Sequence, residues 1–263
     1  MLNFLSILRS GDYYTIVFYV VVLLMRLPAL ILALSVHEAS HAFVAYKLGD
    51  PTARNLGRLT LNPVKHLDLF GTIAMIVFGI GWAKPVPVNS RYFKKPKWGM
   101  ALTAAAGPLS NLLLSLVGVI ALFSFTRLMM LNGEIAGDFA YYRTAYGGSL
   151  YYVLQSLYLN MLINYGLPYK LAAIFGFFLF VFTVLNVSLA IFNLLPIPPF
   201  DGSRILFVFL PDRAYFAVMK YERYIMIGLM ILLMLGAGSS ILGSLMNGAA
   251  SLLFRAFSFI LRI

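Results

Sequence analysis

The sequence predicts an all-α membrane protein that crosses the bilayer with about five to six transmembrane helices, and three observations lead to this prediction. First, 61% of the 263 residues are hydrophobic and only 11% are charged, which lies outside the usual range of soluble domains. Second, apolar stretches recur from Tyr13 to the C-terminus without a long polar linker. Third, lysine and arginine gather in short segments beside these stretches. We therefore expect one membrane-embedded domain over residues 1–263.

The candidate spans are apolar stretches of roughly the 20 residues that a helix needs to cross a bilayer. Residues 13–25 are apolar but too short, and Arg26 and Pro28 are expected to break them from the stretch that follows. We interpret them as a short, tilted or interfacial helix. The predicted spans are residues 27–48, 100–122, 170–194, 224–242 and, with a weaker signal, 248–261.

The apolar stretch 69–82 differs from these spans because basic residues flank it on both sides. Arg54, Arg58 and Lys65 precede it, and five basic residues beginning with Lys84 follow it. If both flanks are cytoplasmic, the stretch enters and leaves on one face, which predicts a re-entrant element. Residues 57–61 and 83–89 are rich in β-branched residues and proline, so we expect short extended or β-hairpin segments there.

The remaining polar region predicts a loop and a surface helix. Residues 132–148 are polar and interrupted by glycine, which favours an external loop, and the tyrosine-rich residues 151–165 favour an interfacial helix. The net charge of +11 lies beside the apolar stretches, where it suits anionic lipid headgroups better than nucleic acid. We expect a multi-pass cell-membrane protein whose partners include the lipid bilayer and no nucleic acid.

The motif that carries chemistry is His37-Glu38-Ala39-Ser40-His41, within an apolar helix. Residues four apart share a helix face, so both imidazoles can reach one cation while Glu38 lies beside them. Three ionisable groups in one apolar helix are costly to bury without partners or a function. The chain has no cysteine, so disulfides and thiolate metal sites are excluded, and any metal is held by imidazole and oxygen.

A catalytic zinc site has three protein ligands and one open position, so a third ligand is needed from elsewhere in the chain. The candidates are His66 and the few aspartates. Asp201 stands out because three prolines among residues 196–199 end a long apolar segment just before it, and Gly202 permits a turn after it. We expect this break near Leu195 to aim Asp201 toward the interior of the helix bundle.

These residues resemble the site-2 protease family of intramembrane zinc metalloproteases, peptidase family M50, in its compact prokaryotic form without an accessory domain. The resemblance rests on His37-Glu38-x-x-His41 and on Asn193-x-x-Pro196-x-x-x-x-Asp201-Gly202 in a later segment. It includes Gly107-Pro108-Leu109-Ser110-Asn111, which is similar to the family's Gly-x-x-x-Asn element. The likeness covers about residues 27–211, which would be the catalytic core, and leaves the C-terminal helices over 220–263 without a motif.

The resemblance implies a Zn²⁺ cofactor, with His37, His41 and Asp201 as its ligands and Glu38 as the catalytic base. It implies hydrolysis of peptide bonds in or near transmembrane segments of protein substrates, at an active site toward the cytoplasmic side. Asn111 and Asn193 are candidates for binding the substrate backbone or a developing oxyanion. His66 matches no ligand position of the family, which favours another role.

Two other classes of function are open at this point. Buried His, Glu and Asp also mark ion pathways, so a metal-ion transporter or channel is one alternative. Such a protein tends to have repeated halves with corresponding broken helices, and the sequence has only the break near Leu195. A non-catalytic relative that binds membrane partners is the other, although it would be expected to have lost Glu38 or a metal ligand.

Overall fold

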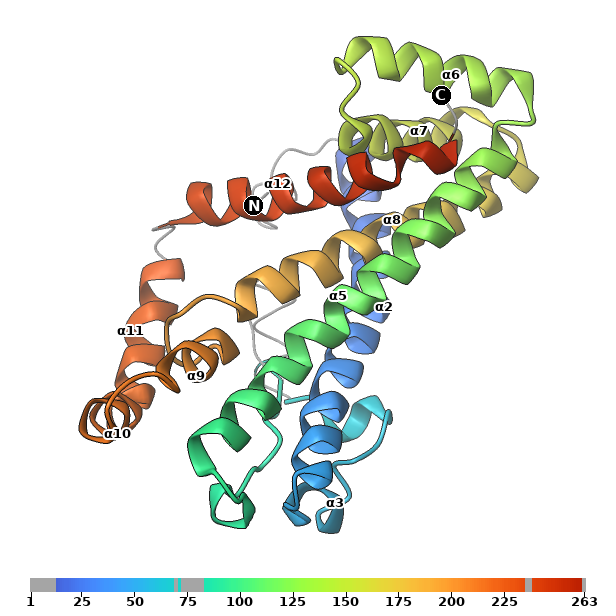
Figure 1. Cartoon of the computed structure of the whole chain (residues 1–263). Coiled ribbons are helices and arrows are strands. Elements are labelled where there is room, and N and C mark those ends of the chain that lie inside the picture. Colours follow the sequence, from blue (N-terminus) through green and yellow to red (C-terminus); the bar gives the residue numbers. More distant parts are fainter. Residues whose placement is uncertain (1–12, 69–70, 72–82, 235–237, 262–263) are drawn as a thin grey trace. The chain divides into compact units, whose positions relative to one another are not determined.

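The computed structural model describes residues 13–68, 71, 83–234 and 238–261 (Figure 1). These ranges are mainly helical, and within them the only β-pairing is an isolated antiparallel bridge between Leu67 and Ala83. The all-α prediction is therefore confirmed. The chain divides into two compact units, which we call unit 1, residues 1–111 and 189–243, and unit 2, residues 112–188 and 244–263.

Three helices in the described ranges are long and apolar enough to cross a membrane, by length and composition. They coincide with the predicted spans 27–48, 100–122 and 170–194. At the last two predicted spans the chain forms α11 (Glu222–Met234) and α12 (Ser239–Phe257), so the total number of spans stays a prediction. The three long helices are α2 (Tyr13–Lys47, of which Val20–Lys47 is the apolar span), α5 (Pro96–Met129) and α8 (Leu167–Asn193).

The expected break at Arg26 and Pro28 is wrong, because α2 runs through both residues. Proline removes one backbone N–H and one hydrogen bond to the preceding turn. In an apolar surrounding, opening the helix further would leave more backbone groups without hydrogen-bond partners. A continuous helix with one missing hydrogen bond therefore has the lower free energy. Residues 13–25 are therefore the first turns of the helix that carries the histidine motif.

After α2, unit 1 continues with short elements and loops. Gly49, with φ +105°, follows the end of α2 in a conformation that other residues rarely adopt. The predicted hairpin is limited, within the described residues, to the Leu67–Ala83 bridge, and residues 57–61 form a turn and a bend. The re-entrant stretch 69–82 lies, except for residue 71, outside the described residues. The short helices are α3 (Thr52–Asn55), η1 (Pro63–Lys65) and η2 (Ser90–Tyr92).

The second part of unit 1 begins within the last turn of α8, which ends at Asn193, as the proline-rich sequence predicts. The chain turns through residues 194–200 into α9 (Asp201–Phe207), followed by α10 (Asp212–Lys220) and α11. The Lys97 ammonium, in the first turn of α5, ties this part to α5. It donates to the Leu210 carbonyl at 2.6 Å and to Asp212 Oδ1 at 2.9 Å.

Unit 2 contains α6 (Gly133–Ala145) and α7 (Leu150–Asn164), joined by a glycine turn. The external loop expected over 132–148 is therefore wrong for most of its length. Asn132 accepts hydrogen bonds from the first backbone N–H groups of α6, and Ile135 and Phe139 bury an apolar face, so two glycines do not prevent the helix. The helix expected over 151–165 is confirmed as α7.

Candidate metal centre

The histidine motif lies on the buried side of α2 in unit 1. His37, Glu38 and His41 are 4%, 8% and 9% exposed, so all three ionisable groups are withdrawn from solvent. Their helix is formed by leucine, isoleucine, valine and alanine, which places the two imidazoles one turn apart on one face, as the spacing predicts.

Asp201 reaches this face because α9 packs closely against the end of α8. A Cβ added to Gly202 would overlap the backbone carbonyls of Leu194 and Leu195, so only glycine allows this approach. The sequence predicted a turn at Gly202, but the residue lies inside α9. Glycine is needed there because it has no side chain that would collide with the end of α8. The Phe192 and Phe200 rings, with centroids 4.3 Å apart, pack across the same turn.

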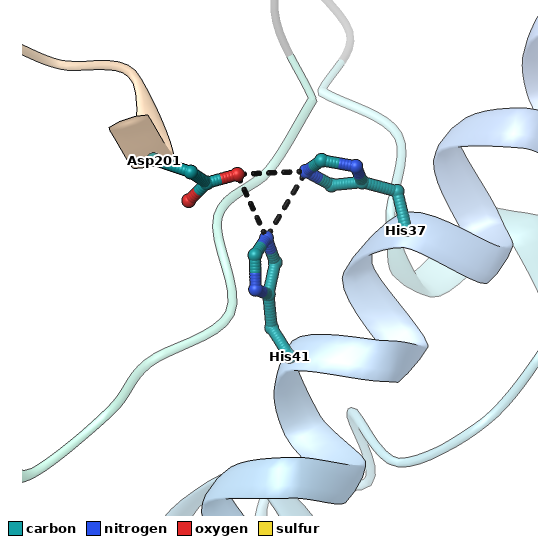
Figure 2. A group of neighbouring side chains, drawn as sticks. All are labelled: His37, His41 and Asp201. Carbon is teal, nitrogen blue, oxygen red and sulfur yellow. Dashed lines mark hydrogen bonds and ion pairs between the residues drawn. The ribbon is translucent and has the colours of Figure 1, made fainter. Parts of the chain in front are cut away.

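Figure 2 shows the three predicted ligands pointing toward one another. His37 Nε2 and His41 Nε2 lie 3.0 Å apart, and they lie 3.2 Å and 3.4 Å from Asp201 Oδ2. Ligands of a tetrahedral zinc ion with bonds of about 2.0–2.1 Å are separated by about 3.3 Å, so this spacing fits one zinc ion. It is the only such group of metal-binding side chains within the described residues.

Electrostatics keep Asp201 in the form that binds a metal. Burial raises the pKa of its carboxyl, but attraction to His41 and hydrogen bonding with both imidazoles outweigh this effect and hold the pKa well below its ordinary value. The group is therefore a carboxylate at neutral pH.

Helix α5 holds the other nitrogen of each imidazole. His41 Nδ1 donates to the Thr103 carbonyl at 2.7 Å, and His37 Nδ1 lies 3.3 Å from Asn111 Oδ1. When a metal ion takes the place of the protons between the imidazoles and Asp201, a proton on each Nδ1 leaves both Nε2 lone pairs free to bind that ion. Between these contacts, a Cβ added at Gly107 would lie 2.5 Å from atoms of both rings, so glycine is required for α5 to approach them.

Glu38 is not part of the three-ligand group but is held beside it. Its Oε2 accepts a hydrogen bond from the Val86 backbone N–H at 3.0 Å. The predicted extended segment 83–89 therefore runs directly past the carboxylate that was predicted to be the base.

His66 and Asn193 lie outside the metal-binding group. His66 is fully buried, and its Nε2 contacts the Thr60 carbonyl at 2.7 Å. Asn193 Nδ2 donates to the Leu189 carbonyl one turn back on α8, at 2.9 Å. The expectation that His66 has another role than metal binding agrees with this geometry.

The roles of Thr103, Gly107 and the Val86 amide were not predicted from the sequence. One signal was available, because Thr103, Gly107 and Asn111 are spaced four apart and so share one face of α5. The Val86 contact is made by a backbone group, for which the sequence offers no signal.

Two buried imidazoles and a glutamate on an apolar helix, with the Asp201 carboxylate from α9 beside them, define a membrane-embedded metal-dependent hydrolase. Comparison with known proteins agrees. The sequence profile of Peptidase family M50 matches residues 25–236, and the chain belongs to this family. It is a zinc metallopeptidase with Zn²⁺ as its cofactor.

Two curated relatives carry matching names. The chain is 37% identical over 229 residues to "Putative zinc metalloprotease YwhC" of Bacillus subtilis (strain 168), covering 87% of this chain and 89% of that protein. It is 31% identical over 108 residues to "Putative zinc metalloprotease Rip2" of Mycolicibacterium smegmatis (strain ATCC 700084 / mc(2)155), covering 38% and 40%. No solved structure matches the chain.

Proposed function

We propose that this M50 peptidase cleaves peptide bonds within or beside the transmembrane segments of other membrane proteins. In this proposal His37, His41 and Asp201 bind zinc, and Glu38 is the general base. The observation that carries it is the convergence of three possible ligand atoms, all within 4.8 Å of one another, two of which belong to a helix apolar enough to span a bilayer.

The position of the motif along α2 supports cleavage at membrane depth. At 1.5 Å per residue, His41 and His37 lie about 9 Å and 15 Å from Lys47 at the end of the apolar span. Basic residues follow at this end, including Arg54 and Arg58. Basic residues gather on the cytoplasmic face of a membrane, so we infer that this end of α2 faces the cytoplasm. The active site would then lie toward the cytoplasmic side of the cell membrane.

Zinc in this site supplies Lewis acidity, which lowers the pKa of water and polarises a carbonyl group. Glu38 then removes a proton from the attacking water and delivers it to the leaving amine. Asn111 has a second function available, because its Nδ2 is buried without a hydrogen-bond partner in the described part of the chain. We assign this N–H group to the carbonyl oxygen of the substrate, on which negative charge develops.

A helical substrate hides its carbonyl groups in internal hydrogen bonds, so it has to unwind locally before attack. The segment 83–89 is the element beside Glu38 with which an opened, extended peptide can pair. The Val86 N–H is already bonded to Glu38, so pairing would use other backbone groups of this segment.

The test has two measurements. Bound zinc is measured on protein purified in detergent, and cleavage is measured on a single-span substrate that is co-expressed with the protein. Glu38→Gln should keep its zinc and lose cleavage, because the amide cannot accept the proton. Asp201→Ala should lose both, because two imidazoles alone hold zinc weakly. Bound zinc is measured by elemental analysis and the cleaved bond by mass spectrometry.

Equal cleavage by wild type and Glu38→Gln would remove Glu38 from the mechanism. Retention of zinc by Asp201→Ala would remove this residue from the ligand set. If the cleaved bond lay far outside the transmembrane segment in every substrate tested, the proposal of cleavage within or beside transmembrane segments would be wrong, and the enzyme would be a protease of exposed loops.

A further inference from the structure

The extended segment 83–89 of unit 1 is fixed at its first end by backbone hydrogen bonds. The Lys84 N–H donates to the His66 carbonyl at 2.8 Å. The buried Arg58 donates from its guanidinium to the Lys84 carbonyl at 2.6 Å. A hydrogen bond from a charged donor is among the stronger kinds, so Arg58 is an effective anchor for this end of the segment.

Asp50 fixes the other end. Its side chain is fully buried just after α2, and Oδ2 accepts the Asn89 N–H at 2.7 Å. Oδ1 accepts the Thr52 N–H at 2.9 Å and the Thr52 hydroxyl. Each oxygen therefore has a separate task, one within the turn after α2 and one toward the distant segment.

Between these anchors, the segment presents a single N–H group to Glu38. Val86 lies between Pro85 and Pro87, which have no backbone N–H and restrict their own φ angles. The Val86 N–H donates to Glu38 Oε2 at 3.0 Å. The sequence thus gives a stiff stretch with one donor at the carboxylate.

We propose that Asp50 and Arg58 are positioning residues for the base, and that they act through segment 83–89. Glu38 and Asp50 both lie on or directly after α2, so the segment bridges two points of one rigid support. It thereby fixes Oε2 with the Val86 N–H and leaves Oε1 to take the proton. This inference rests on the proposed role of Glu38 and extends it to residues that do not touch the substrate.

The experiment measures kcat, KM, bound zinc and backbone hydrogen exchange of residues 83–89 in Asp50→Ala, Asp50→Asn and Arg58→Met. We expect kcat to fall about 10- to 100-fold in Asp50→Ala and Arg58→Met, the range expected when a reacting group is displaced by about 1 Å. Asp50→Asn should lie between these and wild type, because its one amide oxygen cannot serve both Thr52 and Asn89. KM and zinc should stay within about twofold, and exchange over 83–89 should rise.

Thr52→Val is the matched control, because it removes only the hydroxyl contact to Oδ1 and leaves the Asn89 bond in place. It should cleave at nearly the wild-type rate. Val86→Pro combined with Asp50→Ala gives a double-mutant cycle, because Val86→Pro removes the N–H group through which the anchors act. After Val86→Pro, the further loss from Asp50→Ala should be less than about twofold.

Wild-type kcat in Asp50→Ala and Arg58→Met, or effects that multiply with Val86→Pro, would overturn the proposal. Loss of zinc in all three anchor variants would also overturn it, because the residues would then support the fold as a whole. Failure of the proposed function would look different: Glu38→Gln would cleave like wild type, while the exchange of residues 83–89 would still report on the anchors.

Discussion

Unit 1 and unit 2 both bury polar side chains in apolar helices, but the two histidines of unit 1 find their partners differently from the hydroxyl and amide groups of unit 2. In unit 2, Thr126, Thr183 and Asn186 each donate to a carbonyl one turn back on their own helix. In unit 1, His37 and His41 instead contact groups from two other segments, and their remaining nitrogens face the Asp201 carboxylate. Local bonding makes a polar residue tolerable in a membrane helix, whereas convergence of lone pairs calls for a cation.

Helix α5 allows this comparison within one element, because a glycine lies at a close contact in each unit. A Cβ at Gly107 would lie 2.5 Å from His37 Cε1 and from two atoms of His41. A Cβ at Gly118 would lie 2.5 Å from Thr183 Oγ1. The same substitution therefore tests a metal centre in one unit and helix packing in the other.

The largest effect is expected for Gly107→Ala. The new methyl group displaces both imidazoles, whose Nδ1 atoms are held by α5 itself, so the rings cannot move without breaking those contacts. Bound zinc should fall below half of the wild-type content, and cleavage should fall about 100-fold or more. Elemental analysis and a substrate-cleavage assay measure the two. Full zinc content with wild-type cleavage would show that the site tolerates a side chain here.

Asn111→Ala should have the next largest effect. It removes the group that orients His37 and also the Nδ2 that we assign to the substrate carbonyl. Loss of such an outer contact to a metal ligand typically costs about 10- to 100-fold in activity or metal affinity. Asn186→Ala is the control, because Asn186 donates to the Phe182 carbonyl within α8 and has no proposed role in the site, so its cleavage rate should stay close to wild type. Equal losses in the two variants would contradict the distinction between them.

Gly118→Ala should destabilise the protein without removing zinc. The methyl group crowds Thr183, and overpacking of this kind costs about 1–3 kcal/mol. Thermal unfolding in detergent should therefore shift downward while the zinc content per folded protein stays at the wild-type value. Loss of zinc at temperatures where the protein is folded would show that unit 2 packing controls the site.

The smallest effect is expected for Tyr158→Phe. The Tyr158 hydroxyl is buried and lies 2.7 Å from Thr126 Oγ1. When the Tyr158 hydroxyl is removed, Thr126 keeps its hydrogen bond to the Leu122 carbonyl. Interhelical hydrogen bonds of this kind contribute about 0.6 kcal/mol on average in membrane proteins. A shift of the unfolding midpoint of at most a few degrees should follow, with unchanged cleavage. A large loss of activity would show that this contact serves more than packing.

Helical periodicity explains which parts of the site the sequence could predict. His37 and His41 are four residues apart in an apolar helix, and the prolines after Asn193 force that helix to end, so both features follow from local rules. The Pro28 break and the loop over 132–148 were wrong because residue preference was overruled, by the apolar surrounding in α2 and by burial of Ile135 and Phe139 in α6. Local rules predict elements well where no tertiary contact competes with them.

The sequence by itself determined that the chain is helical and membrane-embedded, and that two imidazoles and a glutamate share one apolar helix. It left open whether Asp201 or His66 completes the metal site. Only the tertiary structure decided which of the two side chains lies beside the imidazoles, because the close approach of Gly202 to the end of α8 brings Asp201 to them, while His66 is turned to the Thr60 carbonyl. The same holds for the Val86 N–H at Glu38: a contact between distant segments depends on the path of the whole chain, which no local pattern encodes.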